Sequence, residues 1–388
     1  MEIHLEICIM SRSKNPKPHL SETKMSKIRE LHQAGQSAWL DFIHRGMLDS
    51  GELKDTIAAD GLMGITSNPS IFEKSITSSN DYDASIAELV KEKPDMSMYE
   101  LFNNLAVNDI RDAADEFKKV YEDTNKVDGY VSIEVSPELA HDAEGTIKEA
   151  LELYSWIDRS NIMIKVPGTP AGLVAIEKLI AEGVSVNVTL LFSVQRYKEV
   201  VEAHIRGLKT RLAAGKSIEG IGSVASFFIS RVDAAVDPQL EAAGNTDLQG
   251  QIAIANAQLS YQYFEEVYNG PEFAELKAAG AQVQRLLWAS TSTKNPEYSD
   301  VLYVDELIAP DTVNTIPPAT YDAFKDHGTI DQTLKVGIEE AAGKVATAKD
   351  LGVDIDAITD KLEADGIVAF QESFRNLLDS LKQKVESL

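Results

Sequence analysis

The sequence predicts an α/β fold: a single (β/α)8 barrel of the TIM type with additional helices. Short runs with β-like composition alternate with helical stretches along the 388-residue chain, and eight such runs are present. Alternating strands and helices form parallel βα units, and a count of eight favours a closed barrel over an open sheet. No repeat of roughly 20 to 50 residues occurs, which excludes a solenoid.

The expected strands are residues 38–42, 62–66, 130–135, 162–166, 184–190, 224–228, 284–289 and 312–316. Helical segments lie between them; in residues 170–182, for example, apolar residues recur at spacings of three and four. Thr169 suits the N-cap of this segment and Gly183 its C-terminal cap. Residues 354–388 predict an extra helix packed on the barrel. Its apolar face consists of Phe370, Phe374, Leu377, Leu381 and Val385.

Residues 1–24 do not match a targeting signal. Their acidic side chains argue against a transit peptide, and their apolar stretch is too short for a secretory signal. Met25 opens a segment with helical spacing. We interpret residues 1–24 as a disordered extension or a misassigned start, and residues 25–388 as one barrel domain.

The composition excludes several classes of partner. The chain has 62 acidic and 37 basic residues and a formal net charge of −25, which disfavours binding to nucleic acids and to anionic membranes. No window holds the roughly 20 apolar residues that span a bilayer. Cys8 is the only cysteine, so neither an intrachain disulfide nor a cysteine metal cluster can form. A reducing, cytoplasmic location is expected.

Charged side chains interrupt three of the expected strands. Asp41, Glu134 and Lys165 each stand within or at the end of an otherwise apolar run. The outer face of a barrel strand packs against helices and must be apolar, so these charges are expected to face the barrel interior. Buried charges that lack partners cost several kcal/mol, so we expect the three side chains to lie together.

Two further polar residues join this interior face. Asn187 and Thr189 alternate with aliphatic residues in 184–190, which places both on one face of the strand. The alternative is a buried ion pair that only specifies register, but such pairs add little stability. Lys165 lies at the C-terminal end of its strand, which is the end of a barrel where active sites are built, and this position favours a catalytic group.

The chemistry of a buried lysine beside carboxylates is specific. A desolvated lysine can present a free amine that attacks a carbonyl and forms a Schiff base. The protonated imine withdraws electrons from the adjacent C–C bond, and a carboxylate that removes a hydroxyl proton can then trigger cleavage. Such a mechanism requires no metal and no cofactor. The seven histidines show no ligand spacing, so a metal-dependent aldolase is not expected.

Five segments in this order closely resemble transaldolases. They are residues 61–72, 131–135, 162–166, 187–193 and 287–296. The resemblance implies an enzyme of the pentose phosphate pathway. Such a transferase moves a dihydroxyacetone unit from sedoheptulose 7-phosphate to glyceraldehyde 3-phosphate, giving erythrose 4-phosphate and fructose 6-phosphate. Its implied partners are sugar phosphates, and either a monomer or a homodimer fits.

The resemblance also implies roles for individual residues. Lys165 matches the Schiff-base lysine, and Asp41 the acid/base at the breaking bond. Glu134 matches the carboxylate that activates a water beside Thr189. The residues that match substrate and phosphate contacts are Asn68, Asn187, Ser226, Arg231, Ser292 and Lys294.

The chain departs from the better-known branch after the seventh strand. That branch has Ser-Phe-Arg-Asn, whereas this chain has Ser292-Thr293-Lys294-Asn295, and either Ser290 or Ser292 could supply the hydroxyl. Fructose 6-phosphate aldolases of the same wider family carry Gln and Tyr at the positions of Glu134 and Phe228, so the residues here favour transfer. A non-transferring aldolase and an inactive scaffold remain the alternatives.

Overall fold

The computed structural model of the protein describes residues 25–388. The expectations for residues 1–24, including Cys8, lie outside the described residues. The strands are β1 (Gln36–Leu40), β2 (Gly64–Thr66), β3 (Tyr130–Glu134), β4 (Ile162–Pro167), β5 (Val186–Leu191), β6 (Ser223–Phe228), β7 (Gln284–Ala289) and β8 (Thr312–Ile316).

The α-helices surround and extend the barrel. They are α1 (Lys27–Gln33), α2 (Arg45–Asp49), α3 (Glu52–Asp60), α4 (Pro69–Thr77), α5 (Asp83–Glu92), α6 (Met98–Asp123), α7 (Ala143–Ile157), α8 (Pro170–Glu182), α9 (Val194–Ala213), α10 (Ser230–Ala242), α11 (Ile252–Tyr268), α12 (Pro271–Ala278), α13 (Leu302–Asp305), α14 (Pro318–His327), α15 (Ala341–Asp350) and α16 (Ile355–Ser387). Short 3-10 turns are η1 (Pro137–Leu139), η2 (Thr333–Lys335) and η3 (Ile338–Glu340).

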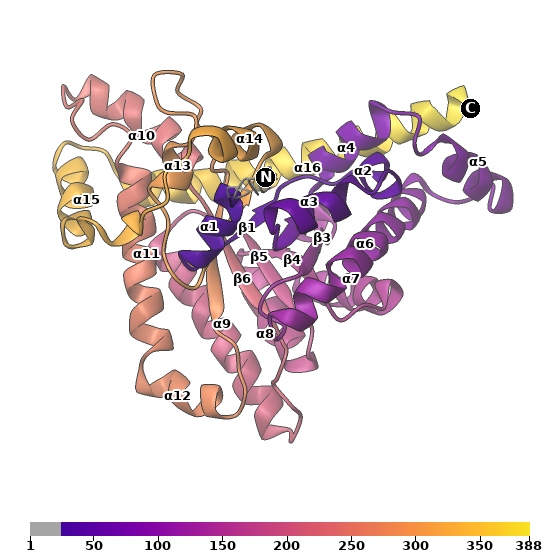
Figure 1. The fold of residues 1–388 in the computed structure, drawn as a ribbon, viewed down its shortest axis with the longest axis horizontal. Helices are drawn as coiled ribbons and strands as arrows, with labels where there is room; N and C mark the ends of the chain where they lie inside the picture. Colours follow the sequence, from indigo (N-terminus) through magenta and orange to yellow (C-terminus); the bar gives the residue numbers. More distant parts are fainter. Residues whose placement is uncertain (1–24) are drawn as a thin grey trace, which may run out of the picture.

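The eight strands form a closed parallel barrel in sequence order, with β8 pairing to β1. Figure 1 shows strands at the centre of the molecule with helices around them. This confirms the predicted (β/α)8 class. All expected strands are present, and β7 and β8 have the predicted bounds. The strand β1 begins two residues earlier than predicted and ends at Leu40, so Asp41 lies just after the strand rather than inside it.

The predicted helix 170–182 is present as α8. The Thr169 side chain accepts a hydrogen bond from Gly172 N, and Gly183 adopts a left-handed conformation with φ 92°, which a glycine tolerates without strain. The expected C-terminal helix is α16, which buries Phe370, Phe374 and other residues of its apolar face. It packs against α4, α6 and α10, and Figure 1 shows it running across the molecule to the C-terminus.

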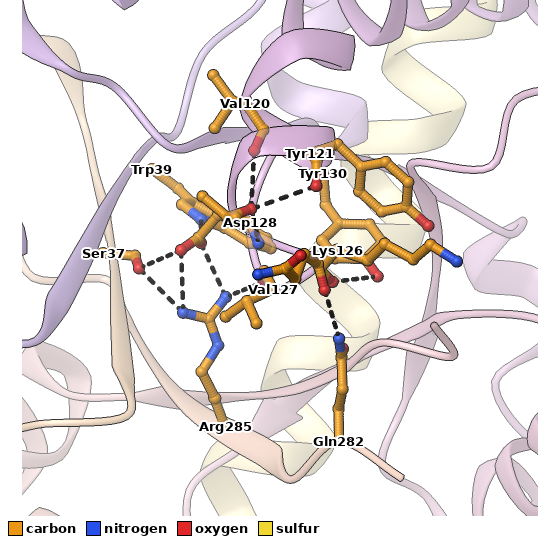
Figure 2. A network of polar contacts seen from close by, with 12 residues as sticks. Ser37, Trp39, Val120, Tyr121, Lys126, Val127, Asp128, Tyr130, Gln282 and Arg285 are labelled. Atoms are coloured by element: carbon orange, nitrogen blue, oxygen red, sulfur yellow. Dashed lines mark hydrogen bonds and ion pairs between the residues drawn. The ribbon is translucent and has the colours of Figure 1, made fainter. Parts of the chain in front are cut away.

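The amino end of the barrel is closed by a buried polar network (Figure 2). Asp128, in the loop before β3, forms an ion pair of 2.8 Å with Arg285 of β7. Its carboxylate also accepts hydrogen bonds from Ser37 Oγ at 2.7 Å and from Trp39 Nε1 at 3.0 Å. Both carboxylate oxygens of Asp128 and both terminal nitrogens of Arg285 therefore have polar partners, which is what a buried ion pair requires.

Along the part of the chain that the structure describes, no helix is long and apolar enough to cross a membrane.

Candidate active site

A cavity of about 160 Å³ lies at the carboxyl end of the barrel, where loops follow the strands. Nearly all of the predicted site residues line it. The lining residues are Asp41, Thr66, Asn68, Lys165, Thr189, Ser226, Phe228, Arg231, Ala289, Ser290, Ser292, Lys294, Thr315, Pro317 and Phe370. A larger groove of about 660 Å³ beside α6 and α7 shares none of these residues, so size alone does not mark the site.

Lys165 is the amine at the centre of the cavity. It belongs to β4, and the strand register places it opposite Glu134 of β3 and Asn187 of β5. Its side chain is only 7% exposed. The Nζ atom donates a hydrogen bond of 3.0 Å to the backbone carbonyl oxygen of Ser67 and lies 3.5 Å from Glu134 Oε2. Lys165 lines the cavity, so a carbonyl compound bound there can reach this side chain.

Asp41 lies at the mouth of the barrel, one residue past β1. Its Oδ1 atom accepts a hydrogen bond of 2.7 Å from Thr66 Oγ1, which in turn contacts Thr315 Oγ1 at 2.6 Å. Burial raises the pKa of Asp41 above its ordinary value of 3.8, although the charge of Lys165 and the Thr66 hydrogen bond oppose that rise. A carboxylate with a raised pKa is a stronger base, which suits proton transfer at a substrate hydroxyl.

Glu134 and Thr189 lie on either side of β4, since β3 and β5 flank that strand. Glu134 Oε2 and Thr189 Oγ1 are both buried and make no hydrogen bond within residues 25–388. Burial raises the pKa of Glu134, and the Lys165 charge opposes this rise. A buried oxygen that lacks a hydrogen-bond partner can be satisfied by a water, and the resemblance implies a water that Glu134 activates beside Thr189.

Asn187 and Asn68 differ from each other in their surroundings. Asn187 is fully buried and does not line the cavity, because Ser226 Oγ donates to its Oδ1 at 2.6 Å and its Nδ2 donates to Ser132 Oγ at 3.1 Å. Asn68 lines the cavity, and its Oδ1 accepts a hydrogen bond of 3.0 Å from Ile71 N as the N-cap of α4. Of the two, Asn68 lines the cavity, and the predicted substrate contact of Asn187 stays a prediction.

Two cations meet at the outer part of the cavity. Arg231 is the second residue of α10, and its guanidinium lies 5.5 Å from the centre of the Phe228 ring. Burial lowers the pKa of Arg231. Desolvation and the Arg231 charge both lower the pKa of Lys294, although much of that side chain is exposed. Neither cation has a carboxylate partner in the described part of the chain, so the pair is suited to an anion.

Both candidate serines after β7 line the cavity. Ser292 Oγ accepts a hydrogen bond of 2.7 Å from Lys294 Nζ, and Ser290 Oγ lies 3.0 Å from Ser230 Oγ. Ser290 has a positive φ of 56°, an uncommon conformation for a residue other than glycine. Ser292 is thus coupled to the cation and Ser290 to the start of α10.

A family model described as Transaldolase/Fructose-6-phosphate aldolase matches residues 38–381. The chain belongs to this family. Transaldolase 2 of Nostoc sp. strain PCC 7120 is 48% identical over 378 residues, which cover 94% of this chain and 99% of the relative. Transaldolases of Trichodesmium erythraeum and Mycolicibacterium smegmatis are 46% and 44% identical, and each alignment covers 92% of this chain and 97% of the relative. Every predicted site residue lies within the segment that matches the family.

Among solved structures, the active domain 2 of a chitinase from Pyrococcus furiosus covers 79% of this chain and 96% of its own, with 14% identity and a TM-score of 0.26. This similarity is too low to inform the function.

Thr66, Thr315 and Phe370 are among the lining residues that the sequence analysis did not single out. Thr66 ends β2 and Thr315 lies in β8, and a polar residue in each of these strands was a usable signal. Phe370 of α16 was expected on a packing face, and no local pattern could have placed it in the cavity. Within residues 25–388, no cluster of three or more His, Cys, Asp or Glu side chains could hold a metal ion.

Proposed function

We propose that the protein is a transaldolase that transfers a dihydroxyacetone unit from sedoheptulose 7-phosphate to glyceraldehyde 3-phosphate through a Schiff base on Lys165. The observation that carries the proposal is the buried Lys165 amine, 3.5 Å from a carboxylate oxygen of Glu134, in a cavity that Asp41 also lines. Relatives named transaldolase at 44 to 48% identity support the same function. A cytoplasmic location remains a prediction from composition.

The first step joins Lys165 to the donor ketose. The Nζ lone pair attacks the C2 carbonyl carbon, and the resulting carbinolamine loses water to give a protonated imine. Proton transfers are needed at both the oxygen that leaves and the nitrogen that attacks. We assign these transfers to Glu134 and Thr189 acting through a water, because each has a buried oxygen that makes no hydrogen bond within the described residues and the Glu134 carboxylate lies 3.5 Å from the amine.

The second step breaks the C3–C4 bond. Asp41 accepts the proton of the C4 hydroxyl, the C3–C4 electron pair moves toward the imine, and erythrose 4-phosphate departs. The enamine left on Lys165 attacks the aldehyde carbon of glyceraldehyde 3-phosphate, and Asp41 returns the proton to the new hydroxyl. Water then hydrolyses the imine and releases fructose 6-phosphate.

The phosphate group of each substrate is assigned to the outer cation pair. Arg231 and Lys294 are the charges suited to a dianion in a chain whose net charge is −25. A sugar phosphate held there would extend its carbon chain toward Lys165, since one cavity connects the three side chains.

A non-transferring aldolase is the second candidate, because the matching family also includes fructose-6-phosphate aldolase. Glu134 and Phe228 favour transfer by the resemblance stated above. A coupled assay with sedoheptulose 7-phosphate and glyceraldehyde 3-phosphate separates the two activities. Transfer without free dihydroxyacetone supports a transaldolase, and release of dihydroxyacetone supports an aldolase; silence in the assay would overturn both.

The Schiff base has its own test. Borohydride added with fructose 6-phosphate should attach the sugar to Lys165, and peptide mapping should locate the adduct. Lys165→Ala should lose both the adduct and transfer, whereas Lys178→Ala, which changes an exposed lysine of α8, should keep both. EDTA should leave activity unchanged. Full transfer by Lys165→Ala would contradict the mechanism.

A further inference from the structure

The two cations of the phosphate site come from separate segments. Arg231 lies at the start of α10, whereas Lys294 lies in the loop of residues 290–301, which connects β7 to α13. Like charges repel, and this repulsion adds to desolvation, the larger cause, in lowering the pKa of Lys294. Without an anion between the two cations, moving Lys294 away from Arg231 would lower the electrostatic free energy of the loop. Some other contact must therefore hold the loop against α10.

Tyr298 provides such a contact from the same loop. Its hydroxyl donates a hydrogen bond of 2.7 Å to Asp237 Oδ2 on α10. The other carboxylate oxygen, Asp237 Oδ1, accepts a hydrogen bond of 3.0 Å from Gly250 N. Gly250 has a φ of 70°, and a Cβ atom there would lie 3.0 Å from Tyr298 Cζ, so the tyrosine ring rests directly on this glycine. The loop is thus attached to both α10 and the turn before α11.

A second contact of the same kind lies one turn nearer to Arg231. Tyr303, in α13, donates a hydrogen bond of 2.8 Å to Asp233 Oδ2, while Asp233 Oδ1 accepts one of 2.7 Å from Ala253 N. Burial raises the pKa of Asp233 to about 7. Both carboxylates of α10 that follow Arg231 most closely in the sequence are therefore bonded to tyrosines and backbone amides instead of to Arg231.

We propose that Tyr298, acting through Asp237, is a positioning residue that holds Lys294 beside Arg231 and so sets the affinity of the site for the phosphate group of the substrates. This inference rests on the proposed function for the identity of the phosphate ligand. Tyr298 does not line the cavity and touches no reacting atom, so its effect is on binding. Tyr303 and Asp233 hold the base of the same loop.

The conservative variant Tyr298→Phe tests the proposal. It removes the hydroxyl but keeps the ring on Gly250, so the fold should be preserved. We expect KM for fructose 6-phosphate to rise about fivefold to tenfold, with kcat almost unchanged, because one charge-assisted hydrogen bond that orders the loop is lost. Activity on unphosphorylated fructose should not change. Tyr263→Phe, a hydroxyl of α11 outside this cluster, is the matched control and should behave as wild type.

A binding measurement makes the test independent of catalysis. Calorimetric titration with inorganic phosphate should show Kd rising in Tyr298→Phe by a similar factor. Asp237→Asn should weaken phosphate binding too. The double variant should lose less binding free energy than the sum of the two single losses, because both changes alter the same hydrogen bond. If the wild type binds phosphate but transfers no sugar, the proposed function fails while this inference stands.

Three results would overturn the proposal. The first is an unchanged KM and Kd in Tyr298→Phe. The second is an equal loss of kcat/KM on phosphorylated and unphosphorylated ketoses, which would indicate a merely structural role. The third is a wild-type protein that does not bind inorganic phosphate at all.

Discussion

Replacing Asp41 with Asn should separate the formation of the Schiff base from the cleavage step. The substitution is nearly isosteric, and the Oδ1 atom of Asn can still accept the 2.7 Å hydrogen bond from Thr66. The side chain should therefore keep its place, and what is lost is the capacity to accept a proton. Any fall in rate then reports proton transfer rather than misplacement.

The magnitude follows from that single loss. A positioned general acid or base contributes roughly 10² to 10⁴ in rate, so we expect cleavage in Asp41→Asn to be slower by about 10³, equivalent to about 4 kcal/mol in the barrier. The pH dependence has a defined sign. Burial raises the pKa of Asp41, so the wild-type rate should fall as pH drops through a value above 3.8, when the carboxylate takes up a proton. Asp41→Asn should lack this acidic limb.

Two assays together check this expectation. Single-turnover release of erythrose 4-phosphate measures cleavage, and the rate of borohydride trapping measures imine formation on Lys165. Asp41→Asn should form the imine but fail to cleave, whereas Glu134→Gln should form the imine slowly. Asp49→Asn, an exposed change in α2, is the control. Cleavage at the wild-type rate in Asp41→Asn, or imine formation at the wild-type rate in Glu134→Gln, would refute this division of roles.

Three further predictions concern binding and stability. Arg231→Ala should lower kcat/KM about tenfold to a hundredfold on phosphorylated ketoses, and equal losses on unphosphorylated ketoses would contradict a phosphate contact. His204 is buried and burial lowers its pKa from 6.5 to about 3, so only the unfolded chain takes up a proton between these values. Urea unfolding should therefore show a stability loss of roughly 2 kcal/mol at about pH 5 that His204→Gln lacks; an identical pH dependence would refute it. Arg285→Met should destabilise the fold by about 3 to 5 kcal/mol because the buried carboxylate of Asp128 loses its ion-pair partner, and adding Asp128→Asn should recover part of this loss in the same urea assay. An unchanged midpoint would show that the pair is dispensable.

The sequence by itself determined the elements that depend on neighbouring residues. The caps of α8 were predictable because Thr169 and Gly183 act within one turn of the helix they bound. The eight strands were predictable because an apolar run of strand length depends only on local order. Lys165 was identifiable for a related reason: a charge inside such a run has a cost wherever the strand lies.

The local sequence pattern predicted the ends of strands less accurately where contacts with distant parts of the chain decide them. The strand β1 starts earlier than its apolar pattern indicates because Gln36 and Ser37 pair with β8, at the far end of the sequence. In β5 the expected alternation ends at an irregularity between Val188 and Leu191, where Leu190 takes a positive φ of 61°. The register with β6, and not the period of the sequence, decides that irregularity.

Only the tertiary structure decided how the site residues share their partners. The pairing of β1 with β2 brings Thr66 onto Asp41, and closure of the barrel between β8 and β1 brings Thr315 to Thr66. The helix α16 brings Phe370 into the cavity from nearly the other end of the chain. Asn187, expected to contact substrate, is hydrogen-bonded to Ser132 and Ser226, a pairing that its own strand does not reveal. The sequence indicates which side chains the chain must bury. Hydrogen bonds, however, form only between atoms within about 3 Å of each other, and strand register and barrel closure decide which atoms come that close.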